Sequence, residues 1–299
     1  MAETTAPTGS LGGDAAGSRH TPLGAERRAH GGRELRTVEM VWRRELIRWG
    51  RARSRILTAL IQPVLFLFVL GVGLTPLVGE TAGFDFKQFI FPGVVAMSVV
   101  TTAIFSAISV VWDREFGFLR EMLVAPVRRS SLVLGKTIGG ATVASIQGAI
   151  MLGFAPLVGV RLTPQVVVGV LAVSMLMAFA LTSFGVFVAS RIKKMENFQV
   201  VMQFLLLPML FLSGALFPLN NLPGWLAVLT RLNPLTYAVD LLRRAVFSAE
   251  AIPAAVAERF GTGVEVFGTT LPVWSEVLIL IVFAAVFLSL SVRAFDVDE

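Results

Sequence analysis

The chain of 299 residues contains no cysteine, only two histidines and few charged residues. The absence of cysteine excludes disulfides, thiolate metal sites and thiol nucleophiles. Both histidines, His20 and His30, lie in a polar N-terminal stretch, so we expect no histidine-based catalytic or metal centre elsewhere. Charged residues make up 15% of the chain, against about a quarter in a typical soluble protein, and 55% of its residues are hydrophobic. This balance predicts a membrane protein.

Charge is also absent from the middle of six apolar runs. Each run has roughly 20 residues, enough for a helix to cross a hydrocarbon core about 30 Å thick. The six predicted spans are 56–78, 89–112, 137–160, 164–190, 198–217 and 273–292. A secondary carrier usually keeps ionisable groups at membrane depth, and many carriers show internal repeats. Neither feature is visible here, so we expect the energy for any transport to enter outside the spans.

Basic residues are unevenly distributed between the segments that join the spans. With a cytoplasmic N-terminus, 20 of the 26 Lys and Arg residues lie inside and the remaining 6 lie outside. The positive-inside rule therefore predicts a multi-pass protein of the cytoplasmic membrane with both termini in the cytoplasm. Residues 1–55 show no apolar signal-peptide region, so the first span is expected to direct insertion. The net charge of +6 is explained by topology and by attraction to membrane lipids, and no nucleic-acid partner is expected.

The predicted organisation has three parts: a disordered cytoplasmic tail at 1–32, an amphipathic helix at 33–55 and a transmembrane domain at 56–295. The tail lacks apolar periodicity. In the amphipathic helix, apolar side chains share one face and arginines fall mostly on the other, which predicts a helix lying in the membrane interface. The apolar positions are Leu35, Val38, Trp42, Leu46, Trp49 and Ile56.

The longest predicted outer loop, 218–272, is not simply polar. Asn233 is placed to cap a helix that begins at Pro234, a residue without the N–H group that this position leaves unpaired. Apolar side chains recur on one side of that helix, at Leu235, Val239, Leu242 and Val246. We expect such short helices to lie at the outer interface or to dip into it, either capping the bundle or forming an outer gate.

No catalytic motif is visible. Residues 134–137, Leu-Gly-Lys-Thr, resemble the end of a phosphate-binding loop, but Ser130 stands where the first glycine is required and no strand precedes it. We therefore expect no enzyme activity, metal or cofactor in this chain. Most uncharged polar residues in the spans are expected to bond between helices. Those that are candidates for lining a substrate pathway are Thr102, Ser106, Gln147, Gln203 and Ser213.

The segment between the second and third spans predicts a short amphipathic helix over about 112–124. Pro126 should end the helix because it disfavours helical geometry at the preceding residue. The apolar face holds Trp112, Phe116, Leu119 and Leu123, and the opposite arc holds Asp113, Arg114, Gly117, Arg120 and Glu121. This segment has two possible roles. It either packs against the membrane surface as a simple connection between two spans, or it receives force from a soluble motor protein.

Two motifs indicate the second interpretation. The pattern E-x-G-x-L-x-x-M-L-V-A-P-V-x-R at 115–129, followed by L-G-K at 134–136, resembles the membrane subunits of ABC-2 type exporters. The pattern F-L-S-G-A-L-F-P-L at 211–219 is similar to the same family. The resemblance covers about 33–295 and is nearest to drug-export permeases of the daunorubicin-resistance type and to nodulation-factor permeases.

The resemblance implies an all-α fold with six transmembrane helices, a cytoplasmic coupling helix and a separate ATP-binding subunit that holds ATP and Mg. Six helices make a small bundle, so we expect a second permease copy, a homodimer in preference to a paralogue pair. The residues expected to couple to the ATPase are Arg114, Glu115, Gly117, Leu119, Arg120 and Pro126. The expected function is export of an amphipathic drug or natural product. The alternatives are export of a lipid-linked glycan or lipid, and a membrane scaffold without transport activity.

Overall fold

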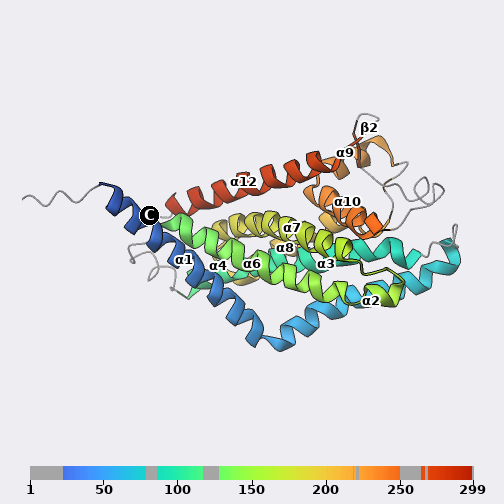
Figure 1. Ribbon diagram of the computed structural model, residues 1–299, viewed down its shortest axis with the longest axis horizontal. Helices are drawn as coiled ribbons and strands as arrows, with labels where there is room; N and C mark the ends of the chain where they lie inside the picture. The colour runs from blue at the N-terminus through green and yellow to red at the C-terminus, as the bar shows by residue number, and fades with distance from the viewer. Residues whose placement is uncertain are drawn as a thin grey trace, which may run out of the picture.

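A computed structural model describes residues 23–78, 86–116, 128–217, 219, 222–249, 264–266 and 269–297. Its long helices run mostly side by side along the long axis of the molecule (Figure 1). The start of helix α1 and the end of helix α12 lie at the same end, and helix α10 lies towards the other. Of the tail predicted at 1–32, residues 1–22 lie outside the described residues.

Each predicted span overlaps a helix. In chain order the elements are α1 (Leu23–Arg51), α2 (Arg53–Val78), α3 (Phe86–Ser106), α4 (Ile108–Glu115), α6 (Arg129–Leu152), the 3₁₀ helix η1 (Ala155–Val158), α7 (Pro164–Arg191), α8 (Met195–Leu212), α9 (Gly224–Leu232), α10 (Pro234–Val246), the 3₁₀ helix η2 (Phe247–Ala249), strands β1 (Glu265–Val266) and β2 (Thr269–Thr270), and α12 (Val273–Val297). The two strands form an antiparallel hairpin.

Among the described residues, four helical stretches are long and apolar enough to cross a membrane: Phe86–Glu115, Pro164–Arg191, Met195–Leu212 and Val273–Phe295. A fifth candidate is the pair Glu34–Arg51 and Ile56–Gly71, which is bent by 71°. Judged by helix length and composition, the described residues therefore contain fewer candidate spans than the six predicted. Helix α6 covers much of the predicted third span, but it is rich in Gly, Ser and Thr and includes the buried Lys136.

Helix α1 begins at Leu23, earlier than the apolar periodicity that starts near residue 33. From residue 34 on, where its side chains are described, the buried ones are Thr37, Val41 and Glu45; they follow each other at intervals of four and so form one narrow stripe, which packs on α6. Trp42 lies beside this stripe, and its indole N–H donates a hydrogen bond of 3.1 Å to Thr142 Oγ1 of α6. Leu35, expected on the apolar face, is 73% exposed. The predicted amphipathic helix thus packs on the bundle through a stripe that only partly matches the predicted face.

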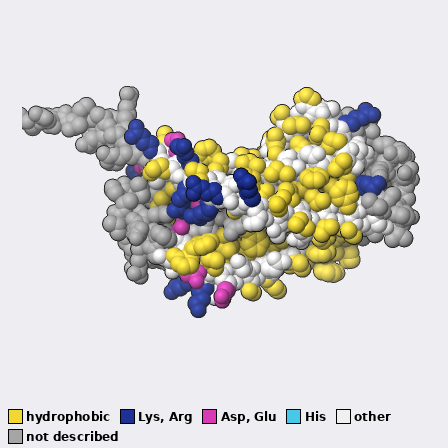
Figure 2. Space-filling model, turned by 90° about the horizontal axis from the view of Figure 1, so that it is seen from below, with side chains coloured by type: hydrophobic (Ala, Val, Ile, Leu, Met, Phe, Trp, Pro, Cys, Tyr) yellow, Lys and Arg dark blue, Asp and Glu magenta, His cyan; other side chains and the backbone are white. Residues whose placement is uncertain are grey.

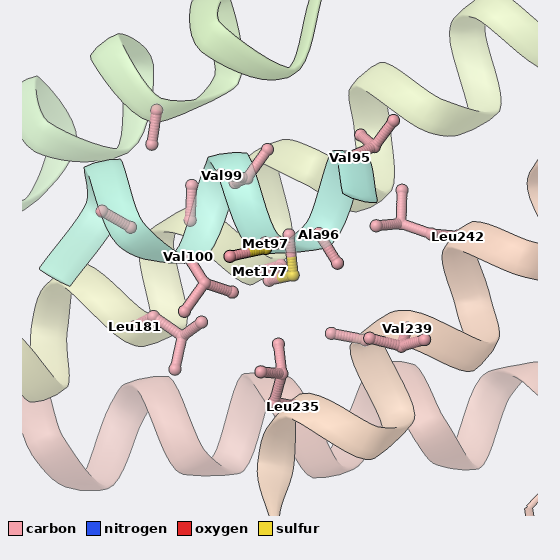
Figure 3. Close-up of a cluster of buried hydrophobic side chains, with 14 of the residues drawn as sticks. Val95, Ala96, Met97, Val99, Val100, Met177, Leu181, Leu235, Val239 and Leu242 are labelled. Carbon is pink, nitrogen blue, oxygen red and sulfur yellow. The ribbon is translucent and has the colours of Figure 1, made fainter. Parts of the chain in front are cut away.

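The core lies where α3, α7 and α10 meet (Figure 3). Helix α3 is buried on most sides, and 15 of its residues are buried. Leu235, Val239 and Leu242 of α10 point into this core. The predicted apolar face of α10 is therefore confirmed, and the helix dips into the bundle to pack on α3 and α7.

Two polar side chains, those of Asn233 and Arg243, help to hold α10 in this position. Asn233 caps the helix as predicted, because its Oδ1 accepts a hydrogen bond from Leu235 N at 3.1 Å. Its Nδ2 donates to Met209 O of α8 at 2.7 Å. Arg243 is buried, donates through Nη2 to Gly214 O at 2.8 Å and lies 4.4 Å from the ring centre of Phe89. Burial lowers the pKa of Arg243 to about 10, so the guanidinium stays charged at neutral pH.

Candidate functional site

Positive charge gathers at one end of the bundle. On the face seen in Figure 2, most Lys and Arg side chains lie in the half that contains α1, with acidic side chains beside them, and hydrophobic side chains cover much of the other half. We call the end formed by α1, α4 and the start of α6 the basic end. It is the part of the described chain where buried charges from three helices meet.

Close packing of α1 on α6 brings these charges together. At Gly135 and Gly139, one helical turn apart, a Cβ would lie 2.8 Å from Val41 Cβ and 2.9 Å from Glu45 Cβ, so only glycine permits this approach. The stripe of α1 that includes Glu45 is thereby held against α6 beside Lys136. The small residues of α6 therefore determine where the charged side chains of α1 lie.

The centre of the charged cluster is a buried ion pair. Lys136 Nζ lies 2.5 Å from Asp113 Oδ2, and the two residues are 4% and 3% exposed. Asp113 also accepts a hydrogen bond of 2.8 Å from Arg44 Nη2, and Lys136 donates to Ser109 Oγ at 3.3 Å. Three helices, α1, α4 and α6, are thus joined through one carboxylate.

The predicted position of Asp113 is wrong. The helical pattern puts it in the charged arc opposite the apolar face of the 112–124 helix, where a side chain would be exposed, but it is buried because two cations from other helices pair with it. Trp112 of α4 and Phe116, the residue that follows the helix, are exposed, and their ring centres lie 5.7 Å apart, as their predicted common face requires.

Arg114 and Glu115, the last two residues of α4, link this helix to α7 and α8. Arg114 Nη1 donates a 2.7 Å hydrogen bond to Ser190 O near the end of α7. Glu115 Oε2 accepts a 3.1 Å hydrogen bond from Met195 N, the first residue of α8. A carboxylate at a helix N-terminus pairs an otherwise unpaired N–H and interacts favourably with the helix dipole. The other predicted coupling residues, Gly117, Leu119, Arg120 and Pro126, lie outside the described residues.

Helix α8 is attached to the bundle along a single stripe. Its buried residues are Phe198, Met202, Leu206 and Leu210, spaced four apart. The opposite side borders a groove of about 750 Å³ that also touches Phe105 of α3. The α8 residues lining this groove are Gln199, Val200, Gln203, Phe204, Leu207 and Pro208. Gln199 and Gln203 are one turn apart and exposed, so the groove is apolar with two amide groups.

The five predicted pathway residues do not lie together. Gln203 lines the α8 groove, whereas Gln147 is fully buried in α6 and neither atom of its amide has a hydrogen-bond partner. Ser213 is buried in the turn after α8, where it donates to Leu210 O and accepts from Ala215 N. Thr102 and Ser106 are half-buried in α3, and Ser106 lines a second cavity near the charged cluster. Only Gln203 of the five is exposed.

No group of three or more His, Cys, Asp or Glu residues that could hold a metal ion occurs in the described ranges. The buried carboxylates at the basic end, Glu45 and Asp113, are surrounded by Arg and Lys side chains. The arrangement is suited to joining helices through charge.

Comparison with known proteins agrees with this architecture. The family model described as ABC-2 type transporter matches residues 36–247, which extend from α1 to the start of η2. The chain belongs to the ABC-2 type transporter family. Nodulation protein J of Rhizobium leguminosarum bv. trifolii is 33% identical over 206 residues, which cover 68% of this chain and 78% of that protein.

Two further relatives are similar at the same level. Nodulation protein J of Sinorhizobium fredii (strain NBRC 101917 / NGR234) is 33% identical over 208 residues, covering 69% of this chain and 79% of that protein. The "Putative transport permease ycf38" of Cyanophora paradoxa is 29% identical over 206 residues, covering 67% of this chain and 71% of that protein. This ABC-2 family member is therefore a multi-pass membrane protein of a family of transport permease subunits, which in general work with a partner ATP-binding subunit.

Sequence reasoning missed two features of this ABC-2 member. The pairing of Lys136 with Asp113 was not foreseen, because their contact depends on how α4 and α6 pack. The glycines at 135 and 139 were a usable signal, since paired small residues mark a close helix contact. The second amide of the α8 groove, Gln199, could have been found from its spacing of four to Gln203.

Proposed function

We propose that this chain is the permease subunit of an ATP-driven exporter that moves an amphipathic drug or natural product out across the cytoplasmic membrane. The observation that carries the proposal is the exposed side of α8, where two amides stand in an otherwise apolar groove. An amide exposed to hydrocarbon is costly because its hydrogen bonds with water are not replaced. The groove therefore suits a pathway that contains water or an amphipathic molecule.

One copy encloses this groove on one side only. In the proposal, a second copy of the chain closes it, so that the α8 helices of the two copies face each other across the pathway. The residues of α8 buried within one copy are limited to a single stripe, which leaves a wide surface for such a contact. The apolar and amide side chains of the α8 groove would then line a pathway between the two copies.

The links from Arg114 to α7 and from Glu115 to α8 support a route for force. In the proposal, the ATP-binding subunit docks on the segment at about 112–124, and its movement on nucleotide binding displaces the end of α4. Because Glu115 is bonded to the first residue of α8 and Arg114 to the end of α7, that displacement acts on the α7–α8 junction. The helix that borders the groove is then the first to move.

The proposed orientation places the basic end and both termini in the cytoplasm. A reporter fused after Glu299 should then behave as cytoplasmic, and one inserted near Gly261 as external. Protease protection or a compartment-specific enzyme fusion measures both positions. A cytoplasmic signal from the insertion near Gly261 would overturn the six-span topology.

The chain's lack of cysteine permits a direct test of the pathway. Gln203→Cys should form a disulfide cross-link between two copies in membranes, and should react with a water-soluble maleimide. The matched control is Val282→Cys, an exposed position of α12 that lies in an apolar helix and faces away from the groove in the proposal. It should neither cross-link nor react. Equal behaviour of the two variants would contradict a pathway along α8.

Transport itself is tested in cells that express the chain together with its ATP-binding subunit. Accumulation of a panel of fluorescent amphipathic drugs should fall for at least one of them. The control replaces the catalytic base of the ATPase, which should restore accumulation. If no compound's accumulation depends on ATP hydrolysis while a labelled lipid-linked glycan is exported, the cargo assigned here is wrong and the glycan alternative holds.

A further inference from the structure

A second cavity lies between α1, α3, α4 and α6, beside the charged cluster and the bend at Ala52. Its volume is about 480 Å³, within the range of ~300–1,000 Å³ usual for small-molecule sites. It lies at the basic end and shares one lining residue, Phe105, with the α8 groove. The lining residues are Glu45, Arg48, Trp49, Ala52, Phe105, Ser106, Ile108, Ser109, Trp112, Asp113, Gly140 and Val143.

The polar part of this cavity has bonding capacity that the described residues do not fill. Glu45 is 8% exposed, yet its Oε1 accepts no hydrogen bond, and the nearest cations stand 3.6–3.7 Å away. Within the described part of the chain, Arg48 makes only ion pairs, at 3.6 Å to Glu45 and 4.0 Å to Asp113. A buried polar atom left in this state is costly, so a ligand that supplies both an acceptor and a donor is favoured.

The net charge of the side chains around the cavity determines which hydrogen-bond donor and acceptor groups a ligand can carry. The cluster contains three cations, Arg44, Arg48 and Lys136, and two carboxylates, Glu45 and Asp113, so one positive charge is not balanced. An anionic acceptor next to Arg48 balances it, and guanidinium pairs well with phosphate oxygens. An ammonium donor at Glu45 would be repelled by the three cations around it. A neutral hydroxyl donates to the same oxygen without that repulsion.

The remaining wall is apolar and of the kind found at membrane interfaces. Trp49 and Trp112 border the cavity from α1 and α4, and Phe105 and Ile108 continue the surface towards α3. Indole rings favour the level of lipid headgroups, where one edge is wet and the other apolar. The cavity thus joins a charged recess to an apolar surface able to hold acyl chains.

We propose that this cavity binds one anionic phospholipid with a phosphoglycerol headgroup. Its phosphate pairs with Arg48, a glycerol hydroxyl donates to Glu45 Oε1, and its acyl chains lie along Trp112, Phe105 and Ile108. Bound there, the lipid fills the space inside the α1–α2 bend and holds α1 against α4 and α6. The proposal concerns a site separate from the α8 groove, so it stands or falls independently of the cargo and of transport.

Lipid retention by the purified full-length chain tests the proposal without an ATPase. The protein is extracted in mild detergent, incubated with equimolar phosphatidylglycerol and phosphatidylcholine, and analysed by native mass spectrometry. We expect phosphatidylglycerol to be retained in preference, and Arg48→Gln to lower its retention about tenfold, as the loss of a charge-assisted hydrogen bond implies. Arg43→Gln is the matched control, since Arg43 lies on the same basic helix and is exposed. It should leave retention unchanged.

Each other result overturns part or all of the proposal. Equal loss in the Arg43 and Arg48 variants indicates diffuse attraction to a basic helix and no defined site. No preference of the unmodified chain for phosphatidylglycerol over phosphatidylcholine has the same consequence. Phosphatidylmethanol, which carries the same charge but no glycerol hydroxyl, tests the bond to Glu45. Retention equal to that of phosphatidylglycerol would overturn the phosphoglycerol assignment.

Discussion

In the buried ion pair between Asp113 of α4 and Lys136 of α6, we expect loss of the carboxylate to destabilise the protein more than loss of the ammonium group. Asp113→Asn keeps the shape of the side chain but removes its charge. Among the described residues, Lys136, 4% exposed, is then left with a single carboxylate, Glu45 at 3.7 Å. Leaving a buried charge without its partner costs about 3–5 kcal/mol, and for a protein of this size we expect an apparent melting temperature lower by roughly 10 °C.

The reverse substitution should cost less. In Lys136→Met, Asp113 keeps the hydrogen bond of 2.8 Å from Arg44, so its charge remains paired. We expect a loss of about 1–2 kcal/mol. The double variant removes both charges, leaves Glu45 with Arg44 and Arg48, and should lie within about 1 kcal/mol of the unmodified chain.

The assay is the fraction of monodisperse protein that survives heating, measured by size-exclusion chromatography for all variants in one detergent. Glu34→Gln is the control, because its ion pair with Arg128 lies at the surface, with side chains 32% and 71% exposed. Such a pair contributes about 1 kcal/mol at most. Additive losses in the double variant, or equal losses in the two single variants, would refute the reasoning about Asp113 and Lys136.

The remaining predictions concern backbone contact and coupling. A Cβ at Gly93 of α3 would overlap the carbonyl oxygen of Ala215, so Gly93→Ala should lower the free energy of unfolding by about 1–3 kcal/mol or more. The control is Gly73→Ala, because a Cβ at Gly73 has no neighbouring atom within 4 Å. In the same heating assay this variant should be neutral or stabilising. Glu115→Arg and Gly117→Trp should leave the permease inserted and dimeric while abolishing ATP-dependent efflux. Normal transport by both variants with the ATPase present would show that the 112–124 segment is not the coupling element.

The positions of the helices could be predicted from the sequence because they depend on local signals. Uncharged runs of about 20 residues are long enough to span a membrane, and all of them overlap helices of the structure. The cap at Asn233 followed from the residue type before Pro234, and the face of Leu235, Val239 and Leu242 followed from helical periodicity. Family membership followed from the motifs near 115–129 and 211–219 and is confirmed by the family match.

The surroundings of each side chain were decided by the tertiary structure. A helical projection places Asp113 in a charged arc, but only the packing of α4 beside α1 and α6 shows that this arc meets Arg44 and Lys136 inside the protein. The same holds for polar residues of the spans: Gln147 and Gln203 have the same side chain, yet one is fully buried in α6 and the other borders the groove of α8. Periodicity assigns a residue to a face of its own helix, whereas the neighbour of that face depends on contacts between residues far apart in sequence. The sequence alone therefore determined the helices and the family, and the packing of those helices decided which charges are paired and which polar groups are left to bind a partner.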